Sequence, residues 1–560
     1  MGAQVVAGVD SSTQSTKVVL VDADTGAVLA EGRAPHRVTG VGGVRESDPE
    51  QWWSALRDAL GQAGPLAAEV AAIAVGGQQH GLVTLDRTGR PVRPAILWND
   101  VRAAGHATRL VEALGAAQWA DRVGIVPVAS ITAAKWAWLR DREPEYAAAT
   151  AAIRLPHDYL TGRLTGAAVT DRGDASGTGW YAASAGRYDP AILALPDLDL
   201  DPDRLPAVLP PAAKAGEVRQ DAAAELGLRP GTVVAAGTGD NMAAALGLGL
   251  LPGEPVLSLG TSGTVYAVAE RPAADPTGIV AGFADATGRY LPLACTLNCT
   301  QAVDRFAALL GLDREATEPG GDVVVLPFLD GERTPNLPSA TGLVTGLRHD
   351  TSAGQILRAA YEGAAYVLLA ALDQVTAQTA APPSGALPPG ALPPGGSAPD
   401  TLPPVTSPPG ALPPGTRPPG ASPPDTLPPG TPLPVTLPPG ALLPGALPPG
   451  TPLPVTQPPG APLLDSPLVL IGGGARGQAW RDTVRRLSGR PVQVPDADEL
   501  VALGAAVQAA WCLTGTAPTE IVRAWGTRRG RTWDALPLDE PALARLGAAL
   551  RRGGALLGTA

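Results

Sequence analysis

Two aspartates stand where a carboxylate could take part in catalysis. Asp10 ends the apolar run VVAGVD and faces the turn that follows, from where it could hold Mg²⁺ directly or through water. Asp240 lies in a GTGDN loop between an apolar run and a helix, and there it could accept a proton from an alcohol. An Asx turn at Asp10 and a helix N-cap at Asp240 are the open alternatives.

Two turns between short strands are rich in small hydroxyl residues, and the second also carries glycines. The first is SSTQST, directly after Asp10, and the second lies within PVLSLGTSGTVYAVAE at 255–270. Backbone N–H groups and hydroxyls in such turns can surround phosphate oxygens without steric hindrance. Each turn alone could be an ordinary tight turn, but the occurrence of two similar turns favours phosphate binding.

A third glycine-rich element is VLIGGGARGQAWRDTVRRLSG at 469–489, which predicts a strand, a glycine turn and a helix. Gly472, Gly474 and Gly477 satisfy G-x-G-x-x-G, so an NAD-dependent oxidoreductase is an alternative. That fingerprint belongs to the first βα turn of a dinucleotide domain, whereas here little sequence follows it. Bare backbone at this turn could also receive an adenine or a ribose.

The stretch GGQQHG follows the apolar run AAIAV, which suits a buried strand. Gln78, Gln79 and His80 would then present amide and imidazole groups at the edge of a sheet, suited to reading the hydroxyls of a small polyol. The stretch ILWNDVR could add an apolar wall and further hydrogen-bonding groups. A structural role for the lone histidine is the alternative. The additional candidates are Trp98, Asn99 and Asp100.

The elements around these residues alternate between strand and helix signals. The N-terminus predicts short strands separated by turns, and the 255–270 segment repeats this arrangement about 250 residues later. Two similar hairpins predict a duplicated domain. The stretch DPEQWWSALRDALGQA predicts a helix with Asp48 as N-cap and Pro49 in its first turn. The predicted fold class is α/β.

Composition excludes several classes of protein. Lys and Arg number 42 against 53 Asp and Glu, a net charge of -11, which argues against a nucleic acid partner. The sequence has no export signal and no apolar run long enough for a membrane span. Three cysteines cannot form a disulfide framework. We therefore expect a soluble cytoplasmic protein without a nucleic acid or membrane partner.

A proline-rich insert occupies 381–467 and holds about half of the chain's 61 prolines, in repeats such as GALPPGALPPG. Proline removes backbone donors and glycine adds chain entropy, so this composition predicts a mobile, polyproline-II-like loop without a packed core. Long surface insertions have a modest closure cost, so a surface loop can tolerate an expanded repeat that has no role. We therefore expect the insert to have no partner. The remaining length suits a two-domain enzyme.

With these elements in this order, the chain resembles the FGGY carbohydrate kinases over nearly its whole length, apart from the insert. RESDPEQWW, SITAAKWAWLRD and LPFLDGERTP are similar to family segments, although Arg142 stands where Glu, Gln, Asn or His is usual. The resemblance implies two duplicated RNase H-like domains, as in actin and hexokinase, around a cleft. The implied divisions are 1–243 (sugar side), 244–525 (nucleotide side, interrupted by 381–467) and a C-terminal extension at 526–560.

The resemblance also implies a kinase that uses ATP and Mg²⁺. GQQHG and ILWND favour the 5-hydroxyl of D-xylulose as phosphate acceptor, with another ketose or polyol as the alternative. Asp240 is the implied general base, Asp10 acts on Mg-ATP, and a homodimer is a family-level expectation. The implied sugar contacts are Gln79, His80, Asn241, Trp98, Asn99 and Asp100. The implied nucleotide contacts are Ser12, Thr13, Lys17, Gly260, Thr261, Ser262, Gly263, Gly472, Gly473, Gly474 and Ala475.

A binding or scaffold protein is the third class considered. In that case the proline-rich insert would recruit aromatic grooves, and the kinase body would be inactive. The presence of both Asp10 and Asp240 argues against this alternative.

Overall fold

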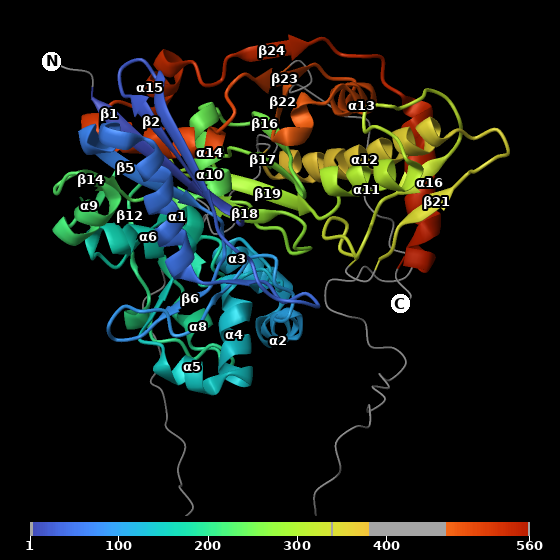
Figure 1. Ribbon diagram of the computed structural model, residues 1–560. Coiled ribbons are helices and arrows are strands. Elements are labelled where there is room, and N and C mark those ends of the chain that lie inside the picture. The colour runs from blue at the N-terminus through green and yellow to red at the C-terminus, as the bar shows by residue number, and fades with distance from the viewer. Residues whose placement is uncertain (1–3, 338–339, 380–465, 558–560) are drawn as a thin grey trace, which may run out of the picture. The chain divides into compact units, whose positions relative to one another are not determined.

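The computed structural model describes residues 4–337, 340–379 and 466–557. The predicted proline-rich insert lies outside the described residues, except for its last two positions. Within the described part, two seven-stranded mixed sheets form the framework, with helices packed on both (Figure 1). This arrangement confirms the predicted α/β class.

The first sheet has the strand order β13-β14-β5-β1-β2-β3, with β15 beside β5. Strands β1, β2 and β3 are antiparallel, while β5 is parallel to β1. Its strands are β1 (Val5–Ser11), β2 (Ser15–Asp22), β3 (Val28–Pro35), β5 (Val70–Gly77), β13 (Lys214–Glu217), β14 (Val233–Ala235) and β15 (Thr238–Gly239).

The second sheet has the order β18-β19-β17-β16-β22-β23-β24. Strands β16, β17 and β19 are antiparallel, and β22 is parallel to β16, so the series β19-β17-β16-β22-β23 repeats β3-β2-β1-β5-β14. The predicted duplication is thus confirmed. The strands are β16 (Pro255–Leu259), β17 (Gly263–Ala267), β18 (Ala281–Ala284), β19 (Tyr290–Thr296), β22 (Leu468–Ile471), β23 (Val492–Pro495) and β24 (Gly530–Trp533).

Strand β1 is apolar from Val5 to Val9 because both of its faces are buried, and the polar Asp10 and Ser11 follow at its end. Val5, Ala7 and Val9 pack in one cluster with Trp52 of α1 (Pro49–Gln62), whereas Val6 joins the cluster on the opposite face. Helix α1 begins as its sequence predicts. The Asp48 side chain accepts a hydrogen bond from the backbone N–H of Glu50, and proline occupies the first turn.

Helix α14 (Leu500–Thr514) packs on the first sheet although it lies near the end of the sequence. A Cβ at Gly8 would lie 1.8 Å from the Ala502 carbonyl oxygen, and a Cβ at Gly504 would lie 1.8 Å from the Ala243 oxygen. Only glycine allows these approaches. They fix α10 (Asp240–Leu248) against α14, and therefore fix the position of Asp240 at the N-terminus of α10.

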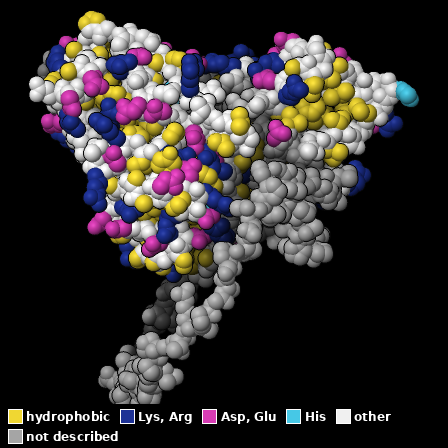
Figure 2. Space-filling view, turned by 60° about the horizontal axis from the view of Figure 1, so that its bottom comes forward, with side chains coloured by type: hydrophobic (Ala, Val, Ile, Leu, Met, Phe, Trp, Pro, Cys, Tyr) yellow, Lys and Arg dark blue, Asp and Glu magenta, His cyan; other side chains and the backbone are white. Residues whose placement is uncertain are grey.

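The segment predicted as a C-terminal extension contributes to the second half of the fold. Strand β24 pairs with β23 and completes the edge of the second sheet, and α16 (Glu540–Leu557) packs on α12 (Ala353–Thr379). No helix in the described ranges is long and apolar enough to cross a membrane. Acidic and basic side chains are interspersed on the face shown in Figure 2, without a broad field of one sign.

The other elements are short or cover the sheets. The remaining helices are α2 (Ala104–Leu114), α3 (Ala116–Val123), α4 (Thr132–Arg142), α5 (Pro144–Ala149), α6 (Pro156–Thr165), α7 (Arg172–Ala175), α8 (Pro190–Leu193), α9 (Gln220–Leu226), α11 (Thr300–Leu310), α13 (Gln478–Ser488) and α15 (Pro518–Trp525), with 3₁₀ turns at Gly64–Glu69, Pro202–Arg204 and Gly473–Arg476. The remaining strands are β4 (Glu46–Ser47), β6 (Val83–Leu85), β7 (Ala95–Ile96), β8 (Ala152–Arg154), β9 (Val169–Asp171), β10 (Tyr181–Ala182), β11 (Arg187–Tyr188), β12 (Ala207–Leu209), β20 (Val324–Leu326) and β21 (Leu343–Thr345).

Candidate active site

The register of the first sheet brings the two predicted aspartates to the same edge. Asp10 of β1 pairs with Gly76 of β5, and Thr238 of β15 also pairs with Gly76. Neighbouring strands are about 4.8 Å apart, and the parallel strands end at the same edge. Asp10, the QQH stretch after β5 and Asp240 after β15 therefore converge there.

Asp240 is the first residue of α10, and Gly239 is its N-cap, so the predicted alternative of a capping aspartate does not describe this side chain. Its Oδ1 accepts hydrogen bonds from the Asn241 backbone N–H (2.8 Å) and from Asn241 Nδ2 (2.9 Å). Burial, followed by the negative charge of Asp10, raises the pKa of Asp240 to about 7. A carboxylate with this pKa can accept a proton from an alcohol near neutral pH.

Asp10 is 4% exposed, and its Oδ1 accepts a 2.5 Å hydrogen bond from Ser12 Oγ. Burial raises the pKa of Asp10 against the opposing effects of Ser12 and Lys17. Lys17 Nζ lies 3.7 Å from Asp10 Oδ2 and 2.6 Å from Glu499 Oε2. Glu499 directly precedes α14. The first phosphate turn is thus held by a residue that is 482 positions away in the sequence.

The residues present fit a magnesium ion that is shared with a nucleotide. No group of three or more His, Cys, Asp or Glu side chains in the described residues is placed to hold a metal by itself. Mg²⁺ commonly takes one or two carboxylates together with substrate phosphates and water, which does not require such a group. Asp10, buried at the end of β1, would be such a carboxylate.

The QQH stretch offers buried polar atoms to a ligand. Gln79 Oε1 accepts a 2.9 Å hydrogen bond from Asn241 Nδ2, which joins this stretch to the residue beside Asp240. Gln79 Nε2, Gln78 Oε1 and Asn99 Oδ1 are buried without a hydrogen-bond partner in the described residues. Because an unpaired buried polar atom costs about 1–3 kcal/mol, these atoms suit a bound polyol.

His80 has a left-handed backbone conformation with φ 62°. Its carbonyl oxygen accepts hydrogen bonds from Thr132 Oγ1 (3.1 Å) and Lys135 Nζ (2.9 Å), both on α4. The imidazole packs against the ring of Phe283, with centroids 5.3 Å apart. Burial, followed by the charge of Lys135, holds the pKa of His80 well below its ordinary value, so the imidazole is neutral.

The ILWND segment contributes in two different ways. Trp98 Nε1 donates to Thr13 Oγ1 at 3.0 Å, which ties the segment to the first phosphate turn. The carboxylate of Asp100 accepts hydrogen bonds of 2.7 to 2.9 Å from the Arg102 guanidinium and one of 2.7 Å from the Arg45 backbone N–H. Asp100 is therefore engaged in ordering the loop, while its predicted contact with a sugar stays a prediction.

A buried charge cluster supports the loop that carries Asp240. His157 Nε2 lies 3.2 Å from Asp158 Oδ1 and 3.3 Å from Asp171 Oδ1. Burial lowers the pKa of His157, but the carboxylates outweigh it and raise the pKa to about 9. Asp171 Oδ2 in turn accepts a 2.7 Å hydrogen bond from Thr238 Oγ1, two residues before Asp240.

The second phosphate turn, Gly260 to Gly263, connects β16 and β17. Thr300 Oγ1, at the start of α11, donates to the Gly260 oxygen at 2.7 Å. Thr264 Oγ1, directly after the turn, donates to Asn241 Oδ1 at 3.3 Å. The turn on the second sheet is therefore linked to Asn241, which donates to the Asp240 carboxylate.

The third glycine element lies beside this turn. Gly472 has φ 81°, and a Cβ there would be 2.8 Å from the Leu259 carbonyl oxygen. A Cβ on Gly473 would meet nothing within 4 Å, so the backbone there is open to a flat ligand. The element follows β22, the strand parallel to β16 in the middle of the second sheet. It is not the first βα turn that a dinucleotide fingerprint requires.

Family models match both halves of the chain. The N-terminal domain of the FGGY family of carbohydrate kinases matches residues 5–247, and its C-terminal domain matches residues 256–387. This chain belongs to the FGGY family of carbohydrate kinases. As an FGGY kinase, it has two related α/β domains, which confirms the resemblance in the sequence, and the NAD-dependent alternative is set aside.

The more similar relatives of this FGGY kinase carry the name xylulose kinase, and a more distant structure shares the fold. It is 54% identical over 553 residues to the xylulose kinase of Streptomyces rubiginosus, covering 99% of this chain and 97% of that protein. The crystal structure of xylulose kinase from Bifidobacterium adolescentis is 33% identical with a TM-score of 0.71, covering 98% of this chain and 99% of that chain. Plasmodium falciparum glycerol kinase with ADP, 17% identical with a TM-score of 0.71 over 98% of each chain, shows the same fold.

Sequence reasoning missed several residues that shape this FGGY site. Lys135 is fully buried in α4, and a lysine within the apolar stretch AAKWAW was the available signal. His157 and Asp171 are linked through Thr238 to the loop that carries Asp240, yet no local pattern separates them from surface residues. Thr264 directly follows the second turn, but its bond to Asn241 could not be read from that segment, and Glu499 reaches Lys17 only through tertiary packing.

Proposed function

We propose that this FGGY kinase transfers the terminal phosphoryl group of ATP to the 5-hydroxyl of D-xylulose, giving D-xylulose 5-phosphate and ADP. The observation that carries the proposal is Asn241, which holds the Asp240 carboxylate, accepts from Thr264 beside the second phosphate turn, and donates to Gln79 of the QQH stretch. The base therefore lies between a phosphate turn and a polyol-binding edge. The choice of D-xylulose is supported by relatives named xylulose kinase.

The chemistry assigned to Asp240 is a single proton transfer. Its ionised carboxylate accepts the proton of the 5-hydroxyl as the sugar oxygen bonds to the terminal phosphorus of ATP and the bond to the ADP oxygen breaks. Mg²⁺, when bound at Asp10, neutralises charge on the phosphates. No covalent intermediate with the protein is required, because phosphoryl transfer needs mainly positioning and charge neutralisation.

The two phosphate turns and the glycine element are assigned to ATP. Backbone N–H groups and hydroxyls of the Ser12–Lys17 and Gly260–Gly263 turns suit phosphate oxygens. The open backbone at Gly473 suits the adenosine, and the adjacent Gly472 packs directly on Leu259 beside the second turn. The proposed adenosine site and the Gly260–Gly263 turn would then share the second sheet, and the Ser12–Lys17 turn would approach the phosphates from the first sheet.

Replacing His80 with alanine is expected to raise KM for D-xylulose at least tenfold while KM for ATP changes less than twofold. The neutral imidazole lies at the sugar edge, and losing a hydrogen bond to a substrate hydroxyl costs on the order of 1.5 kcal/mol. Initial rates with each substrate varied in turn measure this. His349→Ala, at an exposed position, is the matched control. Equal rises in both KM values would contradict the assignment.

The activity is expected to rise with pH through about 7. Asp240 acts as a base only when ionised, and its pKa is raised to about 7, so kcat/KM for D-xylulose should fall about tenfold per unit below that pH. His80 is neutral over this range, so its titration does not contribute to the fall of kcat/KM at acid pH. A pH profile with circular dichroism at each point would measure it. A profile that is flat between pH 5.5 and 7 in folded protein would contradict the role of Asp240.

The experiment that tests the substrate is ADP release by the purified protein with Mg-ATP. The panel contains D-xylulose, D-ribulose, L-ribulose, L-xylulose, glycerol, gluconate and no sugar. We expect the highest kcat/KM with D-xylulose. A higher value with another sugar would keep the kinase reaction but overturn the substrate assignment. A homodimer and a cytoplasmic location stay predictions, and sedimentation velocity measures the first.

A further inference from the structure

The segment LPFLDGERTP carries a buried carboxylate that organises the start of α11. Glu332 is 1% exposed, and it accepts hydrogen bonds from the backbone N–H groups of Leu297 (2.6 Å) and Arg333 (2.7 Å). Asn298 Nδ2 donates to Glu332 Oε2 at 3.1 Å and to the Gly331 oxygen at 2.8 Å. So many donors to one buried carboxylate fix residues 297 and 298 relative to Glu332.

These contacts continue to the second phosphate turn. Residues 297 and 298 lead into α11, which begins at Thr300. Thr300 donates to the Gly260 oxygen from both its backbone N–H (3.1 Å) and its Oγ1 (2.7 Å). A displacement of Glu332 would therefore be transmitted to the turn assigned to ATP phosphates.

Arg333, the residue after Glu332, contacts the loop before α4, in the N-terminal half of the chain. Arg333 Nη1 lies 3.5 Å from Ser130 Oγ, in the loop before α4. The Ser130 carbonyl oxygen accepts from Lys135 Nζ, and the same Nζ donates to the His80 oxygen at 2.9 Å. Lys135 is 0% exposed and burial lowers its pKa to about 7, so Lys135 Nζ depends on these carbonyl groups in place of water.

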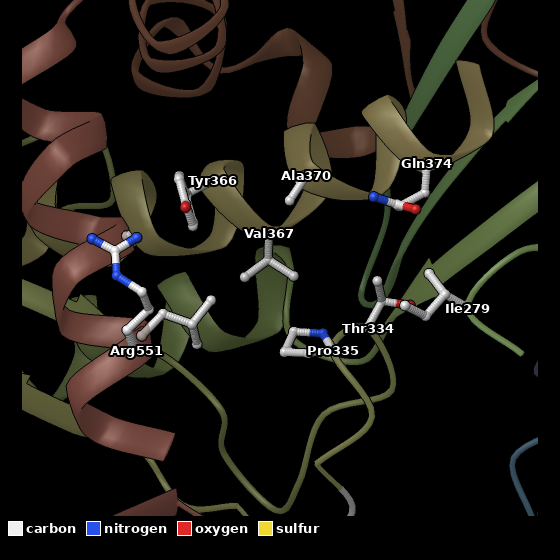
Figure 3. Close-up of a pocket in the computed structure, with 10 residues that line it drawn as sticks. Ile279, Thr334, Pro335, Tyr366, Val367, Ala370, Gln374 and Arg551 are labelled. Atoms are coloured by element: carbon white, nitrogen blue, oxygen red, sulfur yellow. The ribbon is translucent and has the colours of Figure 1, made fainter. Parts of the chain in front are cut away.

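The other end of the segment lines a pocket together with residues of α12. In Figure 3, Thr334 and Pro335 lie on one side of a pocket, opposite Val367 and Ala370 of that helix. Arg333 is anchored through its backbone N–H, which donates to Glu332 Oε1 at 2.7 Å, and the next two residues line the pocket beside α12. An anchored arginine transmits a displacement that a free side chain would absorb.

We propose that Glu332 and Arg333 couple the two substrate sites, with Arg333 as a positioning residue. Nucleotide at the Gly260–Gly263 turn favours the arrangement in which Arg333 meets Ser130, and this arrangement holds His80 in its sugar-binding conformation. By thermodynamic linkage, sugar must then tighten nucleotide binding by the same factor. The inference deepens the proposed function and rests on it.

The test measures the dissociation constant of D-xylulose by titration calorimetry, without nucleotide and with saturating Mg-ADP. In the unaltered protein, we expect Mg-ADP to tighten D-xylulose binding at least about fivefold, which is within the usual range of coupling between sites. The coupling ratio is the dissociation constant of D-xylulose without nucleotide divided by that with Mg-ADP. In Arg333→Gln, this ratio should fall to less than about two, while the dissociation constant without nucleotide changes less than about threefold. A reverse titration of Mg-ADP, with and without D-xylulose, should give the same ratio.

Further variants separate coupling from a general loss of structure. Ser130→Ala removes the hydroxyl that Arg333 contacts and should also lower the ratio, while Arg333→Lys should restore part of it. Arg348→Gln is the matched control, because this arginine side chain is 71% exposed and contacts only Asp322 at 3.5 Å among the ion pairs described. Its ratio should equal that of the unaltered protein.

Three results would overturn the proposal. These are a ratio of one in the unaltered protein, an unchanged ratio in Arg333→Gln, and an equal loss of D-xylulose affinity with and without nucleotide in that variant. Failure of the proposed function looks different, because the unaltered protein would then neither bind D-xylulose nor release ADP with it.

Discussion

Replacing Asp240 with asparagine is expected to lower kcat for D-xylulose phosphorylation by about three orders of magnitude, within the usual range for loss of a general base. The amide keeps the size of the side chain and its hydrogen-bonding oxygen, so the contacts with Asn241 can persist. It cannot accept the proton of the sugar hydroxyl. The dissociation constant of D-xylulose should therefore change only a few-fold.

Steady-state kinetics and calorimetry on the same preparation measure these two quantities. Asp58→Asn is the control, because that carboxylate side chain is 55% exposed on α1. Its kcat should be unaltered. An Asp240→Asn protein that is folded and keeps more than about a tenth of the original kcat would contradict the assignment of the base.

Replacing Asp10 with asparagine is expected to lower kcat by about two to three orders of magnitude and to raise KM for Mg-ATP. The variant removes the carboxylate that fits Mg²⁺ and lies beside Ser12 and Lys17. It also removes a negative charge that raises the pKa of Asp240. The acid limb of the remaining activity should consequently move to lower pH, because ionised Asp240 is then less disfavoured.

The shift of the pH profile distinguishes this explanation from a general loss of structure. It is measured as kcat/KM for D-xylulose between pH 5 and 8 at saturating Mg-ATP. Asp24→Asn, in the exposed turn after β2, should leave both the rate and the profile unchanged. An Asp10→Asn protein with its acid limb still at about pH 7 would show that Asp10 and Asp240 do not interact in the working enzyme.

The sequence was sufficient to predict the duplicated fold because the relevant signals are local. The first hairpin of each half carries a turn of small hydroxyl residues, with glycines in the second turn, and each hairpin is an antiparallel pair in the structure. The N-terminus of α1 was predictable from Asp48 and Pro49 for the same reason. Strand order followed only through the family resemblance, since apolar periodicity does not specify which strands pair.

The relationships between distant segments could not be predicted. Lys17 contacts Glu499, and α14 packs on β1 through Gly8, but neither local sequence indicates its partner. Asp100 illustrates the converse, because its type and position suggested a sugar contact while its carboxylate is engaged by Arg102. Side-chain roles of this kind depend on packing, which a single sequence does not reveal.

The most direct test of the account is to identify the product formed from D-xylulose carrying ¹³C at C5. The protein is incubated with Mg-ATP and the labelled sugar, in parallel with Asp240→Asn, and the products are followed by ¹³C and ³¹P NMR. The account predicts one sugar phosphate with ¹³C–³¹P coupling at C5, formed by the unaltered protein and barely detectable with the variant. Phosphate at another carbon, or equal product formation by the variant, would contradict it.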